Sequence, residues 1–328
     1  MGGAHAGAVH DATTLRAPRR LPGGNLQTIW PVLCSRQPPD VRWRRERWDA
    51  PDGDFVDVDF VDAAAARTPL LVLLHGLEGS SQSHYARSFA HWAHANGWRF
   101  AVPHWRGCSG ELNRAPRAYH SGDHEEVDWL LTRLRTTAGA LYVVGVSLGG
   151  NALLRWAAEA GDLANTRVRA LASVSAPLDL AAGGAALGRG FNRLVYTGMF
   201  LRTMKAKALA KLEQHPGLFP REQMLAARTL YEFDNVFTAP LHGFRDTDDY
   251  WSRASAKPHL ARIRVPTLAL NARNDPFVPA ASLPRDGGAH VTLWQPAHGG
   301  HVGFPGGGFP GHLMTLPDAV MGWMRSIG

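Results

Sequence analysis

The chain has 328 residues, of which 45% are hydrophobic and 19% charged. This composition indicates a globular protein that buries one large core or two modest ones, and it argues against a disordered or fibrous chain. The 35 glycines and 22 prolines follow no period, which excludes collagen and indicates many turns between short elements. Apolar runs such as Leu70–Leu74 are short, whereas a bilayer span takes about 20 apolar residues, so we expect no transmembrane helix.

The charge is moderately positive, with 35 lysines and arginines against 28 aspartates and glutamates and a formal net charge of +7. The arginines are scattered along the chain, so we expect no nucleic-acid partner. One cluster comprises Arg42, Arg44, Arg45 and Arg47. These side chains could contact phosphates or anionic lipid, or they could pair with acids across a strand. We favour the second interpretation because Asp57 and Asp59 follow at strand spacing.

Two features bear on the cellular compartment. Residues 1–20 lack the positive start, apolar stretch and small-residue cleavage site of a secretory signal. Only two cysteines are present, Cys34 and Cys108, which favours a reducing environment. We therefore expect a cytoplasmic protein without an integral membrane segment. Peripheral contact with a membrane and the oligomeric state are left open.

The expected elements begin with an antiparallel hairpin over residues 41–62, where Val56, Val58 and Phe60 share one face. From residue 70 onward, continuous apolar runs alternate with helical stretches, as in parallel strands covered on both faces. The expected strands are 70–74, 98–102, 141–146, 170–174, 265–271 and 291–294. The expected helices are 83–96, 123–134, 148–160 and 316–327.

Residues 178–263 break this pattern, because they contain helical segments at 193–212 and 221–231 and no convincing buried strand. We interpret them as a helical cap inserted over the sheet. The chain then divides into an N-terminal arm (1–40), a catalytic domain (41–177 and 264–328) and the cap (178–263). The fold class is α/β, with a mostly parallel sheet and an N-terminal antiparallel hairpin.

The strongest local motif is Gly145-Val146-Ser147-Leu148-Gly149, which directly follows an apolar strand and directly precedes an alanine-rich helix. A serine on such a sharp turn is held out from the sheet, and the flanking glycines avoid collisions that larger side chains would make. Ser147 is therefore the candidate nucleophile. The alternative is a glycine-rich turn whose serine only caps the helix.

A neutral serine needs a base and a group that orients the base. Asp275 follows the strand at 265–271, where functional loops are expected, although an Asp-Pro turn is its ordinary alternative. His301 follows the strand at 291–294 and suits the base, with His298 as a competitor three residues away. A zinc site at this His-x-x-His pair is disfavoured because no Glu follows the first histidine and no third ligand is near in sequence.

Acyl transfer also needs donors for the developing oxyanion. The segment His75-Gly76-Leu77-Glu78-Gly79 follows the first parallel strand, where such a fold supplies one backbone N–H, and the residue after the nucleophile supplies another. We expect the backbone N–H groups of Leu77 and Leu148 to be the two oxyanion donors. An ordinary tight turn at His75-Gly76 is the alternative.

These motifs together resemble the YheT-like branch of the α/β hydrolases, which is related to plant EMB8-like and animal ABHD1/ABHD3-type proteins. The resemblance runs from about Leu21 to the C-terminus. Besides the segments above, it rests on Gly24-Asn25-Leu26-Gln27-Thr28, Arg106-Gly107-Cys108-Ser109-Gly110, Tyr119-His120-Ser121-Gly122, Phe233-Asp234, 239–244 and Gly299-Gly300-His301-Val302-Gly303-Phe304. Asn25 departs from the pattern, since many relatives have histidine there.

The resemblance implies a catalytic triad of Ser147, Asp275 and His301, which settles the rivalry with His298. It implies hydrolysis of carboxylic esters, with small-molecule or lipid-like substrates and no cofactor or metal. It also places Arg106, Tyr119 and His120 near the mouth of the site, with His75 and His298 as further neighbours. Cys108 is not expected to be the nucleophile, because no strand-to-helix turn surrounds it.

Aromatic residues of the cap have two interpretations. They could form an acyl pocket, or they could seal the cap onto its domain, and we favour the seal. They are Phe191, Tyr196, Phe200, Phe233, Phe237 and Tyr250.

Two alternative functions remain from the sequence. An acyltransferase would use the same catalytic residues with an alcohol in place of water. A non-catalytic binding protein on the same scaffold is disfavoured by the presence of nucleophile, acid, base and both glycine-rich turns.

Overall fold

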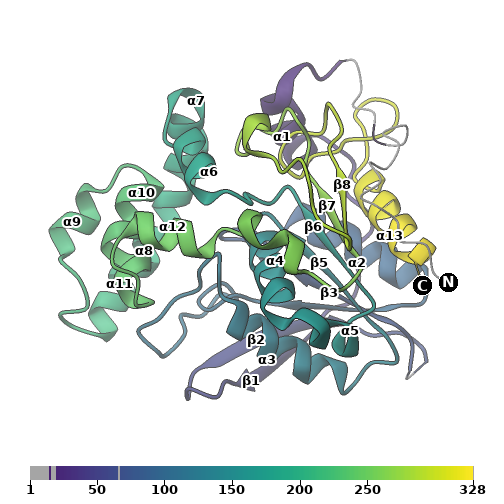
Figure 1. The fold of residues 1–328 in the computed structure, drawn as a ribbon, viewed down its shortest axis with the longest axis horizontal. Helices are drawn as coiled ribbons and strands as arrows, with labels where there is room; N and C mark the ends of the chain where they lie inside the picture. The colour runs from purple at the N-terminus through teal and green to yellow at the C-terminus, as the bar shows by residue number, and fades with distance from the viewer. Residues whose placement is uncertain (1–14, 16–19, 66, 328) are drawn as a thin grey trace.

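The computed structural model describes Leu15 and residues 20–65 and 67–327. Within these residues one mixed sheet of eight strands has the order β1-β2-β4-β3-β5-β6-β7-β8, with helices on both of its faces (Figure 1). The strands are β1 (Arg44–Asp49), β2 (Phe55–Val61), β3 (Leu70–Leu74), β4 (Arg99–Pro103), β5 (Leu141–Val146), β6 (Ala170–Val174), β7 (Thr267–Leu270) and β8 (Val291–Trp294). The expected α/β fold with an N-terminal hairpin is confirmed.

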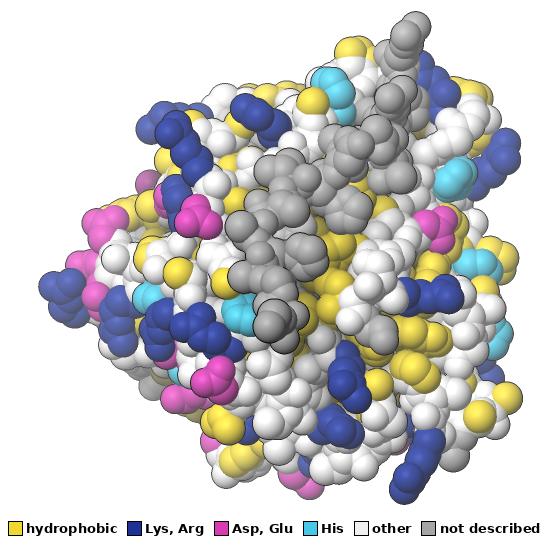
Figure 2. Space-filling view, turned by 45° about the vertical axis from the view of Figure 1, so that its right-hand side comes forward, with side chains coloured by type: hydrophobic (Ala, Val, Ile, Leu, Met, Phe, Trp, Pro, Cys, Tyr) yellow, Lys and Arg dark blue, Asp and Glu magenta, His cyan; other side chains and the backbone are white. Residues whose placement is uncertain are grey.

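The hairpin of β1 and β2 forms the antiparallel edge of the sheet, and β2 also pairs antiparallel with β4. Arg45 lies opposite Asp59 and Arg47 opposite Asp57. Each pair forms an ion pair, with N···O distances of 2.7 and 2.8 Å. Pairing with acids across the strands is thus confirmed for Arg45 and Arg47, and Arg44 pairs with Asp62 at 2.8 Å. On the face of the molecule that Figure 2 shows, lysines and arginines are spread out and form no single band.

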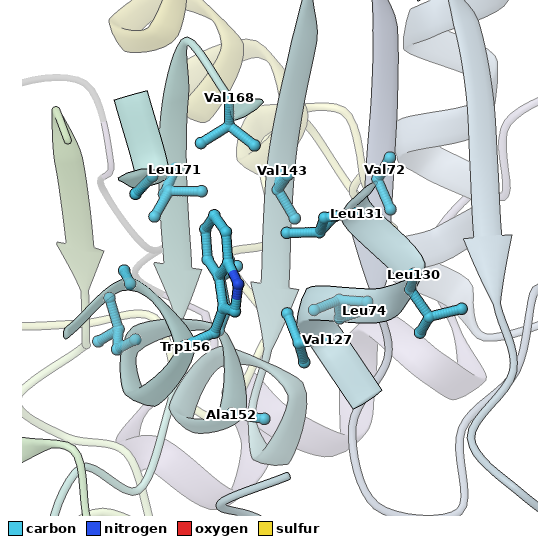
Figure 3. Close-up of a cluster of buried hydrophobic side chains, with 14 of the residues drawn as sticks. Val72, Leu74, Val127, Leu130, Leu131, Val143, Ala152, Trp156, Val168 and Leu171 are labelled. Atoms are coloured by element: carbon cyan, nitrogen blue, oxygen red, sulfur yellow. The ribbon is translucent and has the colours of Figure 1, made fainter. Parts of the chain in front are cut away.

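The remaining strands are parallel, and two apolar layers cover the two faces of the sheet. On one face α3 (His124–Arg135) and α4 (Leu148–Ala160) pack Leu131 and Trp156 against Val72 and Val143 (Figure 3). On the other face α2 (His84–Ala95) and α13 (Thr315–Ile327) pack against alternate residues of the same strands. Because both faces are buried, the strands read as continuous apolar runs.

The segment between β6 and β7 contains helices and no strand within its described residues, and it stands to one side of the sheet (Figure 1). Its helices are α6 (Leu180–Leu187), α7 (Gly190–Asn192), a π-helical turn (Arg193–Thr197), α8 (Gly198–Gln214), α9 (Arg221–Ala226), α10 (Leu230–Phe233), a second π-helical turn (Asp234–Thr238), α11 (Ala239–Leu241), α12 (Thr247–Ala254) and a 3-10 segment (Lys257–Arg262). The helical segment expected over 221–231 is divided between α9 and α10. Ala227 leaves the helical conformation, and Thr229 caps a new helix through a reciprocal capping box with Glu232.

The arm contains a helix that the sequence did not predict, α1 (Gly23–Leu33). Residues 1–14 and 16–19 of the arm lie outside the described residues. Minor elements complete the fold: α5 (Ala164–Arg167) and 3-10 turns at Gly161–Leu163 and Ala280–Ser282. None of the helices among the described residues is long and apolar enough to cross a membrane.

Candidate active site

Ser147 occupies the sharp turn between β5 and α4. Its backbone has φ 52° and ψ −119°, an unfavourable region for a residue with a Cβ atom. The glycines beside it are needed for close approach: a Cβ at Gly149 would lie 2.3 Å from the carbonyl oxygen of Leu74, and one at Gly145 would lie 2.5 Å from that of Gly149. The turn therefore holds the serine out of the sheet at the carboxyl end of β5.

Ser147, His301 and Asp275 come together as a hydrogen-bonded row. The Oγ of Ser147 lies 3.1 Å from Nε2 of His301, and Nδ1 of His301 lies 2.9 Å from Oδ2 of Asp275. The other carboxylate oxygen, Oδ1, accepts the backbone N–H of Phe277 at 2.8 Å. A buried carboxylate at Nδ1 favours the tautomer that leaves Nε2 free to accept the serine proton.

His298, the competing histidine, does not join this row. Its side chain is exposed, and its Nδ1 lies 3.5 Å from Nδ2 of Asn274. No hydrogen bond connects it to Ser147 or Asp275 within the described residues. The geometry therefore favours His301 as the base.

Helix α1 braces the loops that carry the acid and the base. The Oγ1 of Thr28 accepts the backbone N–H of His301 at 2.9 Å. The Oε1 of Gln27 accepts the N–H of Gly299 at 2.8 Å and the side-chain amide of Asn274 at 2.9 Å. Gln27 is only 2% exposed. Sequence reasoning missed this role, although the motif Gly24–Thr28 had been noted as part of the resemblance.

The oxyanion donors expected from the sequence lie beside the serine. A Cβ added to Gly76 would lie 3.1 Å from the Cβ of Ser147, so the turn leading into Leu77 passes directly against the nucleophile. Leu148 is the first residue of α4, where the N–H has no partner within the helix. Neither N–H donates to another described residue. Both remain predictions as oxyanion donors.

Glu78, the residue after Leu77, is held by two side chains. Its backbone has φ 56°. The hydroxyl of Tyr119 accepts the N–H of Glu78 at 3.0 Å and donates to its Oε1 at 2.9 Å. From α8, Nζ of Lys207 donates to the same Oε1 at 2.9 Å. Tyr119 and Lys207 thereby fix the loop that carries the expected oxyanion donor.

His75 and Arg106 form no hydrogen bond with Ser147 among the described residues, although Arg106 lines the same cavity as this serine. His75 is fully buried, and its Nε2 accepts the backbone N–H of Trp105 at 3.1 Å, while Nδ1 contacts the carbonyl oxygen of Gly76 at 2.8 Å. Burial lowers the pKa of His75 to about 3, so the ring is neutral. Arg106 pairs with Asp54 and Glu126 at 2.8 and 2.6 Å.

His120 lies farther out, in a group of aromatic rings. Its ring centroid is 4.6 Å from that of His242 and 5.8 Å from that of Tyr250. Burial lowers the pKa of His120 to about 3. Its position makes it part of the wall of a cavity, with no contact to the serine.

A largely apolar cavity opens above Ser147 and His301, between the sheet and the helical insertion. Its wall includes Leu77, Leu148, Phe200, Phe233, Phe237 and Tyr250. Four of the six cap aromatics singled out from the sequence thus line it. Phe233 and Phe237 also pack in the core of the insertion, so one set of rings serves both roles. Phe191 is instead exposed, and Tyr196 packs against Phe277.

Cys108 is half-buried near this loop, with its Sγ 3.4 Å from Nζ of Lys207. Burial raises the pKa of its thiol to about 11, which leaves it protonated and a poor nucleophile. Within the described part of the chain, no group of three or more His, Cys, Asp or Glu side chains is arranged to hold a metal ion.

Comparison with known proteins places the chain in a family. Residues 69–307 match the α/β hydrolase fold family. The chain is 40% identical to the "Putative esterase YheT" of Escherichia coli over 92% of its length and 90% of that protein's. It is 29% identical to the mouse phospholipase ABHD3 over 90% of its length and 74% of that protein's, and 28% identical to the yeast monoacylglycerol lipase over 80% and 59%.

Solved structures give the same fold. The ferulic acid-bound Est1E from Butyrivibrio proteoclasticus matches with a TM-score of 0.56 and 15% identity, over 86% of this chain and 98% of that one. The Pyrococcus furiosus esterase Pf2001 matches with a TM-score of 0.52 and 14% identity, over 89% and 96%. At these identities the likeness concerns the fold alone. The chain belongs to the α/β hydrolase fold family and, within it, to the YheT-like branch.

Proposed function

We propose that this protein is a serine hydrolase that cleaves carboxylic esters through an acyl-enzyme. The observation that carries the proposal is the row Ser147–His301–Asp275, which opens on an apolar cavity. A serine hydroxyl within hydrogen-bond distance of a carboxylate-oriented imidazole is the arrangement that nucleophilic acyl transfer requires. The family membership and the names of the relatives support an ester hydrolase.

In the first half of the reaction, Oγ of Ser147 attacks the ester carbonyl carbon while Nε2 of His301 accepts the serine proton. The tetrahedral intermediate then breaks its bond to the alkoxy oxygen, which takes the proton from His301 and leaves as the alcohol. Asp275 holds the imidazole by Nδ1 and stabilises its positive charge. Because Asp275 is buried and its Oδ1 is already engaged by Phe277, its position is fixed before substrate binds.

In the second half, water gives a proton to His301 and attacks the acyl carbon. The bond from the acyl carbon to Oγ of Ser147 then breaks, Oγ takes the proton from His301, and the carboxylic acid leaves. The backbone N–H groups of Leu77 and Leu148 stabilise the oxyanion in both halves. Each lies on an element fixed by other contacts: α4 for Leu148, and the Glu78–Tyr119 pair for Leu77. A donor fixed in advance costs no reorganisation during the reaction.

The substrate we propose is an ester with an apolar acyl group. The exposed surface of the cavity above Ser147 is largely apolar, and part of its wall comes from the helices at 178–263, which we propose act as a cap. Relatives named as a phospholipase and a monoacylglycerol lipase support a lipid-like ester. The cytoplasmic location expected from the sequence remains a prediction.

Hydrolysis of nitrophenyl esters with graded acyl chains tests this function. We expect kcat/KM to rise with chain length until the cavity is filled and then to fall, and we expect Ser147→Ala to abolish turnover throughout the series. Undiminished turnover by that variant would contradict the proposal. Adding an alcohol distinguishes an acyltransferase: if ester product exceeds acid at low alcohol concentration, transfer rather than hydrolysis is the reaction.

A further inference from the structure

One stretch of the cap is basic and carries no acid. Residues 180–212 contain six lysines and arginines and no aspartate or glutamate. The three lysines are held by oxygens of the protein itself: Lys205 by Leu225, Lys207 by Glu78 and Lys211 by Ala115. The other three basic residues are exposed, and their side chains form neither an ion pair nor a hydrogen bond with any described residue: Arg189, Arg193 and Arg202.

Large apolar side chains project into solvent among these arginines. Leu194 is 81% exposed and Met199 is 51% exposed, and Phe191 and Val195 are exposed as well. They lie on consecutive helical elements, from α7 through the π-helical turn to the start of α8. The opposite side of the same elements is buried through Tyr196 and Leu201. The segment is therefore held firmly by its inner face while its outer face combines free cations with apolar groups.

This outer face adjoins the cavity above the serine. Leu187, Phe200 and Met204 belong to the same segment and line that cavity. Helix α1 lies beside it, because the hydroxyl of Tyr196 donates to Oδ1 of Asn25 at 3.0 Å. Figure 1 shows α6 and α7 projecting from the body of the molecule on the side where α1 also lies. A partner bound here would lie next to the cavity.

We propose that this cap surface, formed by Arg189, Phe191, Arg193, Leu194, Val195, Met199 and Arg202, docks on an anionic lipid bilayer. Apolar side chains that insert at the headgroup boundary, flanked by arginines that contact lipid phosphates, are the combination that membrane-surface helices use. The absence of any carboxylate between residues 180 and 212 matches a negatively charged surface. A nucleic acid would bind the arginines through its phosphates, but it would not account for the exposed apolar side chains among them.

Vesicle sedimentation tests this proposal without relying on catalysis. The full-length protein is mixed with vesicles of phosphatidylcholine alone or of phosphatidylcholine with phosphatidylglycerol, at low and high salt. We expect binding to the anionic vesicles that weakens with salt. The variant R189Q/R193Q/R202Q should lose about fivefold in partitioning for each arginine removed. L194S/M199S should also lose binding to the anionic vesicles, at low and at high salt.

The matched control is R135Q/R169Q/R325Q, which removes the same charge from exposed positions on α3, before β6 and on α13. It should bind as the wild type does, and all three variants should hydrolyse a short soluble nitrophenyl ester at the wild-type rate. The proposal is overturned if the wild type ignores anionic vesicles, or if the control loses as much binding as the cap variant. It is also overturned if L194S/M199S abolishes a dimer rather than vesicle binding, or if the arginines govern RNA binding instead. Because the readout is sedimentation, inactivity toward esters would leave it unaffected.

Discussion

The Oγ1 of Thr28 accepts a hydrogen bond from the backbone N–H of His301 at 2.9 Å, across 273 residues of sequence. Beside it, the buried amide of Gln27 holds Gly299 and Asn274, which precede the base and the acid respectively. Helix α1 therefore holds both loops, beside the direct hydrogen bond that the N–H of Gly300 donates to Oδ1 of Asn274 at 3.1 Å. The N-terminal arm thus has a positioning role, although it lies outside the sheet.

This relationship predicts the effect of Gln27→Ala. Removing the amide takes away the acceptor shared by the N–H of Gly299 and Nδ2 of Asn274, so the two loops keep only their direct contacts and those with Thr28. A shift of about 1 Å in a catalytic group can cost 10²-fold, so we expect kcat to fall roughly 10- to 100-fold with KM nearly unchanged. Steady-state kinetics on a nitrophenyl ester, with the exposed Gln82→Ala as control, provides the check. An equal loss in both variants, or a change confined to KM, would refute the positioning role.

Tyr119→Phe tests the loop that carries Leu77. The substitution removes the hydroxyl that both accepts the N–H of Glu78 and donates to its carboxylate, while preserving the ring. Loss of one oxyanion donor costs about 10²- to 10³-fold in kcat, and loosening one should cost less, about 10-fold. Tyr142→Phe, on β5, is the matched control.

Lys207 offers a second route to the same loop. Lys207→Met should lower kcat in the same direction as Tyr119→Phe, and Lys207→Arg should restore part of it, because an arginine can still reach the Glu78 carboxylate. If Lys207→Met changed only thermal stability and left kcat intact, its role would be structural alone. In that case the contact between α8 and the loop that carries Leu77 would not affect catalysis.

The sequence predicted much of this site and for identifiable reasons. Ser147 was found because its turn must join a buried strand to a helix, which leaves a local pattern of glycines. Asp275 and His301 follow strands recognisable as apolar runs, but the residues alone could not separate His301 from His298, since the difference is set by which side of the loop faces Ser147. The resemblance to relatives made that choice.

The missed features depend on contacts between distant segments. Helix α1 has a proline at position 31 and no charged residue, and the groups that bury Gln27 come from residues 274 and 299. The break at 227–229 depends on Thr229 competing as a helix cap within a stretch of good helix formers. Neither helix α1 nor the break at 227–229 leaves a pattern of hydrophobic periodicity in the sequence.

The thiol of Cys108 should be unreactive in the native protein. Burial raises its pKa to about 11, so at neutral and mildly alkaline pH it stays in the protonated form, whereas Cys34 is exposed. A disulfide exchange reagent at about pH 8 should modify one thiol quickly, and the second only after denaturation. Cys108→Ser should retain ester hydrolysis. Rapid modification of both thiols with loss of activity would contradict this assignment.

Asp234 predicts a pH dependence of stability. Burial raises the pKa of its carboxyl from 3.8 to about 6, so between these values the folded protein holds a proton that the unfolded chain releases. Stability is therefore lost as pH rises through this window, by at most on the order of 3 kcal/mol, and the loss is constant above it.

Denaturant unfolding of Asp234→Asn at several pH values measures this loss. Relative to wild type, the variant should gain stability as pH rises from about 4 to about 7, on top of a constant cost for the altered hydrogen bonds to Thr238 and Trp251. Asp162→Asn, at an exposed position, serves as control and should parallel wild type. If the difference in stability between Asp234→Asn and wild type did not depend on pH, the raised pKa of Asp234 in the folded protein would be contradicted.

The most direct test of the account is covalent labelling with an active-serine phosphonate, read by intact mass and peptide mapping. We predict one adduct per chain, located on Ser147, absent from Ser147→Ala and strongly slowed in His301→Ala, while both variants keep the wild-type circular dichroism spectrum. Labelling of a different serine, or no labelling of a folded wild-type protein that hydrolyses esters, would contradict it.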